Sequence, residues 1–567
     1  MRYSGLSTKL QAEHTTGRRF AWTDAMIVTA VVLCSFAPYT SRIGFYSDDW
    51  SFVELSRFAD EASVLGTVQE LRQYNRMRPI GDLTRAVQLR VFDDEPRGYH
   101  LVNGAAFLLV VFLFFAVLHQ IGVRRDLALA AALIYAVMPH YSTLRFWFSS
   151  NVANVSCALF LVSVLVDLHA IERRGIARVL LRSLSLLCIA VSLLTYELVL
   201  PLCAGAALCI GWLRRPARRS QPWRDVLWVN LALVVAIFLY KASIPDRLGQ
   251  PDRMTLVQWV WRTLFDPAYG PGSSGLNIGE VFQMYAVTYG AMLPLNAVRL
   301  ALRHPDASVV VAATLCGLLT WASVRAATKS QADVHHGSGF CLALGAVTFV
   351  LGYAIFLTNG NIQLTPTGTG NRTAGVAALG AALILAGGVA LMAGRMGRYR
   401  GDVLAVAVGT LVLLFSLVTG TLSTFWREAY REQIAILSQL REDVPTIPPA
   451  ATLLLDGVCM YQGPAPVFEA PWDLQSVLRI RYDDASLRAD IVNRTLRVEP
   501  DGIHTAEYDT PTHYRFENVA VYDVQSRRLT ALGNFDQASA YFGPSHPRGL
   551  SNGCPQGYGG WGVPVFD

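Results

Sequence analysis

Charged residues are scarce in this sequence, and their scarcity excludes most soluble folds. Asp, Glu, Lys and Arg make up 16% of the 567 residues, whereas 52% are hydrophobic. A soluble domain carries about 25% charged residues. Apolar runs of about 20 residues, long enough to cross a bilayer, recur along most of the chain. The composition therefore predicts a polytopic α-helical membrane protein.

Two other features are also missing from the chain, and the net charge excludes a further class. The first apolar segment is too long for a secretory signal peptide and lacks its small-residue cleavage site, so we expect it to remain as a span. No Cys or His spacing typical of a metal site occurs, so no metal ligand and no certain cofactor is predicted, although a divalent metal stays open. The net charge of +6 does not indicate nucleic-acid binding, because the basic residues cluster in short loops between the spans.

The apolar runs and the basic loops together predict a topology of about eleven spans. Residues 1–21 and the basic loops should be cytoplasmic, because positive charge is retained on that side. The segment 281–302 is apolar but contains Pro294 and polar residues, and we expect a re-entrant or surface-lying helix there, which keeps the later basic loops cytoplasmic. The predicted spans, which together form a membrane-embedded region over 22–425, are 22–40, 99–121, 126–140, 151–171, 179–195, 197–213, 226–243, 307–326, 338–357, 373–394 and 402–425.

Three regions outside the spans should face the extracytoplasmic side. The loop 41–98 has apolar residues every three to four positions from Phe52 to Leu71, a pattern that predicts interfacial helices. The second region is the loop 244–306. The tail 426–567 begins with a charged helix from Trp426 to Asp443, and its short alternating runs predict a small α/β domain.

The cysteines fit this arrangement. Seven of the nine lie in or near predicted spans, where Cys behaves as a small apolar residue. Only Cys459 and Cys554 lie in the tail. In an oxidising compartment they could form a disulfide, or they could be two unpaired thiols.

Two adjacent carboxylates, Asp48 and Asp49, follow the first span and should lie at its extracytoplasmic end. Such a pair can cap a helix, or it can supply a base for chemistry on a lipid-linked substrate. Further polar residues are predicted at the same face. Glu197, between two apolar runs, should pair with a basic group from another loop, and an Arg can hold a phosphate with its planar fork of donors. These further residues are Arg78, Tyr99, His100, Asn103, Arg145, Glu197 and Arg372.

At these positions the chain resembles the GT-C glycosyltransferases, and most closely the protein O-mannosyltransferase-like group. The shared elements are the acidic pair, the Arg78-Pro79 step, Tyr-His-Leu-x-Asn at 99–103, the Pro-His, Thr and Trp of 139–147, and Glu-x-x-x-Pro at 197–201. The resemblance covers roughly residues 20–245 and, more weakly, the chain to about 430. Leu144 and Tyr196 depart from the group's usual acid and Lys, and the tail has no tetratricopeptide repeats.

The resemblance implies transfer of a sugar from a polyprenyl-phosphate donor to an extracytoplasmic glycan, lipid or protein acceptor, with inversion. Asp48 or Asp49 would be the base. The phosphate would be bound by Arg78, His100, Arg145 and Arg372, with Tyr99, Asn103 and Glu197 in support. The membrane would be the inner membrane of a bacterium.

Two other functions remain open. A lipid or polysaccharide transporter or flippase would also place charges in a membrane cavity, but it would more often show internal repeats. A polysaccharide polymerase or ligase would be expected to carry its main external loop late in the chain. In the tail, the segments 469–473 and 557–562 are rich in aromatic and turn residues. They could contact a sugar or simply pack as loops.

Overall fold

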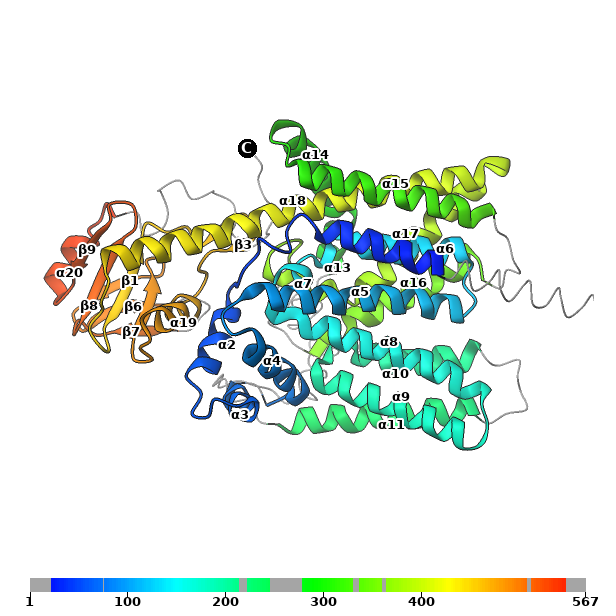
Figure 1. Ribbon diagram of the computed structural model, residues 1–567, viewed down its shortest axis with the longest axis horizontal. Coiled ribbons are helices and arrows are strands. Elements are labelled where there is room, and N and C mark those ends of the chain that lie inside the picture. The colour runs from blue at the N-terminus through cyan, green and yellow to red at the C-terminus, as the bar shows by residue number, and fades with distance from the viewer. Residues whose placement is uncertain are drawn as a thin grey trace, which may run out of the picture.

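The computed structural model describes residues 22–74, 76–213, 222–244, 278–329, 336–358, 364–506 and 511–546. The molecule consists of a bundle of roughly parallel and antiparallel helices, with a smaller α/β domain beyond one end of it (Figure 1). We call the end that carries this domain the domain end, and the other the basic end.

Within the described residues, eight helices are long and apolar enough to cross a membrane. This confirms the predicted class of polytopic helical membrane protein. The eight are α5 (Pro96–Gln120), α8 (Asn151–Glu172), α9 (Gly175–Thr195), α11 (Pro222–Ser243), α15 (Ala307–Lys329), α16 (Ser338–Ala354), α17 (Ala377–Gly394) and α18 (Arg400–Asp443).

Three shorter apolar helices complete the bundle. They are the helix Trp22–Phe36, α6 (Arg125–Val137) and α10 (Leu200–Leu213). All residues of α6 from Asp126 to Val137 are buried, and this helix packs against α5, α15, α17 and α18. A helix that is apolar all round belongs in the interior, so α6 is the central element of the bundle.

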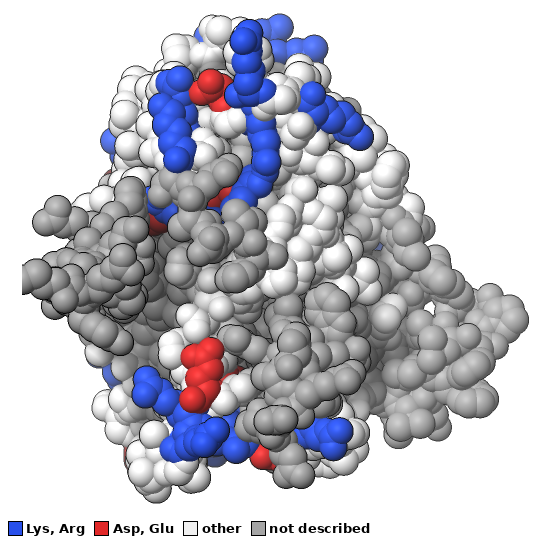
Figure 2. All heavy atoms as spheres, turned by 90° about the vertical axis from the view of Figure 1, so that its right-hand side faces the viewer, with Lys and Arg blue, Asp and Glu red and all other residues white. Residues whose placement is uncertain are grey.

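The predicted cytoplasmic basic clusters gather at the basic end. Figure 2 views this end and shows many Lys and Arg side chains with fewer acidic ones. Several form ion pairs there, including Arg125 with Asp24 at 2.7 Å and Arg325 with Asp402 at 2.8 Å. The predicted cluster at 214–219 lies outside the described residues.

The segment around 281–302 forms a continuous helical stretch of α13 (Ile278–Gln283), the π-helix η5 (Met284–Met292) and α14 (Leu293–Arg303). Both flanks of this region lie at the domain end. Lys241, near the end of α11, pairs with Glu197, while Asp306, before α15, pairs with Arg427 of α18. The chain thus enters and leaves the region at the same end, as expected for a segment that does not traverse the bundle.

The loop 41–98 folds into three helices at the domain end, α2 (Asp48–Arg57), α3 (Val64–Tyr74) and α4 (Pro79–Phe92). The pattern from Phe52 to Leu71 is therefore split between two helices. The second begins beside Ser63, whose Oγ accepts a hydrogen bond from the backbone N–H of Gly66 at 3.0 Å, as N-capping residues do.

α18 continues without a break from the bundle into the α/β domain (Figure 1). The domain holds a four-stranded sheet in the order β4-β1-β8-β9, in which β1 is parallel to both neighbours and β9 is antiparallel to β8. Its elements are β1 (Thr452–Asp456), β2 (Tyr461–Gln462), β3 (Ala465–Pro466), α19 (Pro471–Tyr482), β4 (Arg488–Ile491), β5 (Arg497–Glu499), β6 (Gly502–Thr505), β7 (Thr512–Tyr514), β8 (Val519–Asp523), β9 (Arg528–Ala531) and α20 (Phe535–Tyr541).

Cys459 in this domain is disulfide-bonded. Its predicted partner, Cys554, lies outside the described residues. The seven cysteines in and near the bundle are free thiols, and five of them are buried.

Candidate functional site

The acidic pair lies in the first turn of α2, and its two carboxylates have different surroundings. Asp49 is fully buried. Its Oδ1 accepts hydrogen bonds from the backbone N–H of Ser149 at 2.8 Å and from the Ser149 hydroxyl, and its Oδ2 accepts from the N–H of Tyr46 at 3.1 Å. Burial raises the pKa of Asp49 to about 7, although the bonds from Ser149 and Tyr46 oppose the rise.

Asp48, in contrast, is only partly buried. Its Oδ1 accepts a hydrogen bond from the indole Nε1 of Trp472 at 3.2 Å. Trp472 begins the first turn of α19, so the α/β domain contacts the acidic pair directly. Asp48 is therefore the more accessible carboxylate, whereas the hydrogen bonds of Asp49 hold the start of α2 against Ser149.

The second part of the site is an ion triad at the start of α4. Arg78 donates from Nε to Oε2 of Glu197 at 3.2 Å and from Nη2 to Oε1, and its guanidinium lies 4.2 Å from the centroid of the Tyr196 ring. Lys241 of α11 donates to Oε2 of Glu197 at 3.0 Å. Two cationic side chains therefore donate to the one Glu197 carboxylate.

The triad confirms that Glu197 pairs with a basic group from another loop. It also carries one net positive charge, because two cations face one carboxylate. Lys241 was not predicted from the sequence, since it lies 44 residues from Glu197 at the end of a different helix.

A buried ion pair on α4 joins the triad to the acidic pair. The Nη1 of Arg85 lies 3.5 Å from Asp82, and its Nη2 donates to the backbone oxygen of Ser149 at 3.1 Å. Ser149 is also the residue that holds Asp49. Burial raises the pKa of Asp82 to about 6, against the effect of Arg85 and Arg78. Neither residue was predicted from the sequence, although their spacing of three on a helix was an available signal.

Arg372 lies on the other flank of the acidic pair, in the 3₁₀ turn Thr369–Ala374. Its guanidinium is 4.7 Å from the centroid of the Trp147 ring and donates to the backbone oxygen of Thr369 at 3.3 Å. Trp147 in turn donates to the backbone oxygen of Tyr46 at 2.9 Å, next to the acidic pair. Among the described residues Arg372 has no carboxylate partner, so its charge is available to an anion.

Two other predicted site residues are buried in the bundle. Arg145 is 1% exposed, bonds Ser35 at 2.6 Å and the Ala136 oxygen at 3.2 Å, and lies 4.4 Å from the Phe36 ring. His100 binds the backbone oxygen of Gly44 at 2.9 Å and is also buried. Because no anion can reach either side chain in this arrangement, we leave Arg145 and His100 out of the phosphate site.

Tyr99 and Asn103 make structural contacts next to the acidic pair, and their predicted support of a phosphate site stays a prediction. The Tyr99 hydroxyl donates to the backbone oxygen of Asp93 at 2.7 Å, and its ring packs against Phe148. Asn103 donates to the backbone oxygen of Leu144 at 2.8 Å and accepts from Asn154. These contacts fix the loop that carries Trp147 and Ser149.

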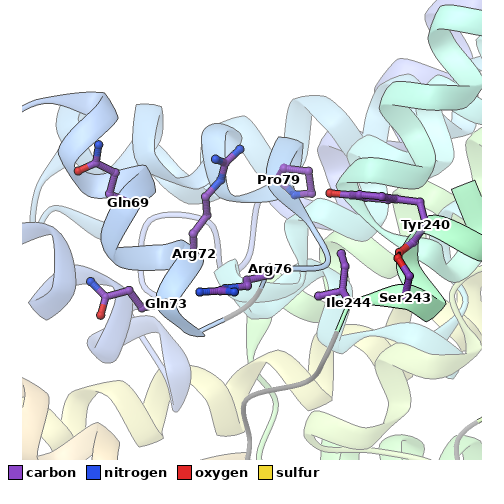
Figure 3. Close-up of a pocket in the computed structure, with 8 residues that line it drawn as sticks. All are labelled: Gln69, Arg72, Gln73, Arg76, Pro79, Tyr240, Ser243 and Ile244. Carbon is purple, nitrogen blue, oxygen red and sulfur yellow. The ribbon is translucent and has the colours of Figure 1, made fainter. Parts of the chain in front are cut away.

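A cavity of about 490 Å³ opens beside the triad, between α3 and the end of α11 (Figure 3). Pro79 follows Arg78 in the chain, and Tyr240 precedes Lys241, so the cavity adjoins two members of the triad. Arg72 and Arg76 are exposed, and neither forms an ion pair with another described residue. The lining residues are Gln69, Arg72, Gln73, Arg76, Pro79, Tyr240, Ser243 and Ile244.

Comparison with known proteins adds no assignment. No family model matches the sequence, and no curated protein matches it. The function must therefore be argued from the site itself.

Proposed function

We propose that this protein is an inverting GT-C-type glycosyltransferase that moves a sugar from a polyprenyl-phosphate donor to an acceptor at the domain end. The observation that carries the proposal is the contrast within the acidic pair. Packing commits Asp49 to the fold and leaves Asp48 only partly buried. Arg372, which has no carboxylate partner among the described residues, contacts Trp147 near the acidic pair, and the triad adds net positive charge. A base next to a cationic anion site is what such a transfer requires.

In the proposed step, one bond forms at the anomeric carbon of the sugar and one breaks. The acceptor hydroxyl gives its proton to the Asp48 carboxylate while its oxygen bonds to the anomeric carbon on the face opposite the phosphate. The bond from that carbon to the phosphate oxygen breaks, and the electron pair leaves on the phosphate. The leaving phosphate needs positive charge rather than a proton, and Arg372 supplies it, supported by the field of the triad.

The cavity at Arg72 and Arg76 is our proposed entrance for the donor headgroup. It opens beside α3, the helix expected at the membrane interface, where a lipid phosphate would lie. Its two guanidinium groups, which have no carboxylate partner among the described residues, favour an anion. From this cavity the donor headgroup would pass along the triad to reach Asp48.

The proposal includes an orientation. Eleven spans would place the basic end in the cytoplasm, because Lys and Arg are retained on that side, and the domain end outside a bacterial inner membrane. Disulfide bonding of Cys459 supports the second placement, because disulfides persist in oxidising compartments.

The test is a transfer assay with the purified protein in liposomes, a panel of labelled polyprenyl-phosphate sugars, and envelope extract as the acceptor source. We expect Asp48→Asn to lower transfer by at least about 100-fold, the usual minimum contribution of a general base, with donor binding retained. The matched control is Asp60→Asn, an exposed acid on the same loop, which should stay active.

Two results would refute this reading. Retention of most activity in both Asp48→Asn and Asp49→Asn would exclude the acidic pair as the source of the base. Accumulation of intact labelled donor across the membrane, with no cleavage of the phosphate–sugar bond, would instead establish the transporter alternative.

A further inference from the structure

The three-stranded sheet of the α/β domain brings together residues that are spread over the sequence. His504 on β6 and His513 on β7 are direct cross-strand partners in the antiparallel register. Asp501 lies in the turn that joins β5 to β6, one residue before Gly502. Cross-strand partners point to the same face of a sheet, so the two imidazoles stand side by side above the strands.

The ring positions are well defined. The two imidazole rings are stacked, with centroids 4.3 Å apart and an angle of 12° between their planes. The Nε2 of His504 is 3.2 Å from Oδ1 of Asp501, and the Nε2 of His513 is 3.5 Å from Oδ2. The ligand atoms of the three residues all lie within 4.8 Å of one another.

These separations suit a small metal ion. Zinc binds His nitrogen and carboxylate oxygen at about 2.0–2.2 Å, so neighbouring ligands of a tetrahedral site lie roughly 3.3 Å apart. The two measured nitrogen–oxygen distances fall close to this value. Small rotations of the exposed side chains would bring the two nitrogens and one carboxylate oxygen around a single ion.

The local charge also favours a cation. Glu499, on β5, places Oε2 3.8 Å from the Nε2 of His504 and could complete the coordination. Arg497 is the cross-strand partner of His504 on the other side. The two carboxylates outweigh this one guanidinium, and the site has net negative charge when both imidazoles are neutral.

We propose that His504, His513 and Asp501 form a binding site for a divalent transition metal of the Zn²⁺ type, with Glu499 or water as the fourth ligand. Imidazole with carboxylate is a ligand set that zinc accepts readily. A bound ion would pin β6 and β7 to the β5–β6 turn and stabilise the small sheet. The site is on the α/β domain and does not depend on the proposed glycosyl transfer.

The test uses the full-length protein in detergent, purified with a tag that contains no histidine and stripped of metal with a chelator. Titration with Co²⁺, followed by its visible absorption, and displacement by Zn²⁺ report the number and strength of sites. We expect one site per chain and a rise in the thermal unfolding midpoint on loading.

Variants locate the site. His504→Ala and His513→Ala should each weaken binding by at least about tenfold, since even second-sphere changes do so at metal sites. His304→Ala, which removes an exposed histidine near α14, should bind as the wild type does. Asp501→Asn gives a milder change in case an alanine variant misfolds, and it should also weaken binding.

Two outcomes would overturn the proposal. One is Zn²⁺ binding weaker than about 100 μM, an affinity too low for a specific site of three protein ligands. The other is binding that persists in the double variant His504→Ala/His513→Ala when its melting curve shows that it is folded.

Discussion

The neighbouring carboxylates Asp48 and Asp49 differ in burial, because the first turn of α2 directs Asp49 inward and Asp48 toward Trp472. The buried member, Asp49, accepts three hydrogen bonds, whereas Asp48 accepts one from the indole. In the sequence these are two identical adjacent side chains. The sequence could therefore locate the pair, but it could not show which Asp is buried and which is accessible. The division depends on Ser149 and Trp472, which come from distant parts of the chain.

The raised pKa of Asp49 predicts a pH effect on stability. Burial raises this pKa to about 7, whereas an unfolded Asp titrates near 4. Between those values the folded state keeps a proton that the unfolded state has lost, so this group's stabilisation falls as pH rises and levels off above about pH 7. Thermal midpoints measured from pH 5 to pH 8 should show the wild type losing stability relative to Asp49→Asn. Parallel curves for the two proteins would contradict this prediction.

The triad predicts how Arg78 and Glu197 depend on each other. Arg78→Ala should lower donor affinity strongly, and Arg78→Lys should restore it only in part, because Lys cannot make the two parallel bonds to Glu197. Glu197→Gln should destabilise the fold by about 3 kcal/mol, because it leaves Arg78 and Lys241 facing each other. Donor binding and thermal midpoints measure the two effects. Wild-type donor affinity in Arg78→Ala would make Arg78 a purely structural residue.

Variants of Arg372 and Arg145 can be compared to separate an effect on donor binding from an effect on stability. Arg372→Gln should lower donor binding at least tenfold, because charge-assisted bonds to phosphate are strong. It should leave the melting midpoint unchanged, because within the described part of the chain the polar partner of Arg372 is one backbone oxygen. Arg145→Gln should do the reverse, because its buried guanidinium is held by Ser35 and the Ala136 oxygen. Loss of donor binding in Arg145→Gln with an intact fold would return Arg145 to the phosphate site.

At the scale of elements, apolar periodicity was a good guide to where helices lie and a poor guide to where they break. The spans expected over 99–121 and 179–195 correspond to α5 and α9. The span 402–425 and the charged helix 426–443 were predicted separately, but they are one helix, α18, because no Pro interrupts it and Gly420 is tolerated within it. The interfacial pattern after Phe52 divides at the Ser63 cap instead, which periodicity does not reveal.

Contacts between elements were the least predictable part of the site. Arg78 and Glu197 were each expected at this face, but Lys241 and Arg85 were not, because they lie on helices whose neighbours only the packed bundle defines. Similarly, the aromatic segment 469–473 was expected to contact a sugar or pack as a loop. The structure instead begins α19 there and places Trp472 on Asp48.

The contact between α2 and α19 predicts a role for Trp472 in transfer. Ser476 and Arg479 of α19 also bond Glu54 of α2, at 2.5 and 2.7 Å, so the helices should stay docked without the indole. Trp472→Ala should therefore lower kcat/KM for transfer about tenfold, one hydrogen bond to a charged group, with donor binding retained. Phe535→Ala, on the exposed face of α20, is the control. Unchanged transfer in Trp472→Ala would reduce this contact to packing.

At the scale of the whole molecule, each end of the bundle has its own chemical feature. The basic end carries the gathered Arg side chains, and the domain end carries a disulfide-bonded cysteine. The overall class could be predicted because it depends on composition, whereas the sidedness of the loops stays a prediction that depends on the charge between the spans. The partner of Cys459 could not be fixed by spacing alone.

This asymmetry predicts the outcome of labelling in intact cells. After treatment with a membrane-impermeant reductant, a membrane-impermeant thiol reagent should label Cys459, and a Cys459→Ser/Cys554→Ser variant should remain unlabelled. The seven thiols of the bundle should not contribute, because five are buried and the other two, Cys34 and Cys209, lie on apolar helices expected to be within the membrane. Labelling only after the membrane is breached would put the α/β domain in the cytoplasm and require 281–302 to cross the membrane.

The hydrogen bond between Asp48 and Trp472 joins residues 424 positions apart, and this separation has a consequence for biosynthesis. Ribosomes add roughly 5–20 residues per second, so the acidic pair emerges about 20–85 s before its indole partner. Throughout that interval the nascent chain has α2 without α19. The site is therefore completed only when the α/β domain has been made and has docked. A chain truncated before α19 would insert into the membrane without the hydrogen bond from Trp472 to Asp48.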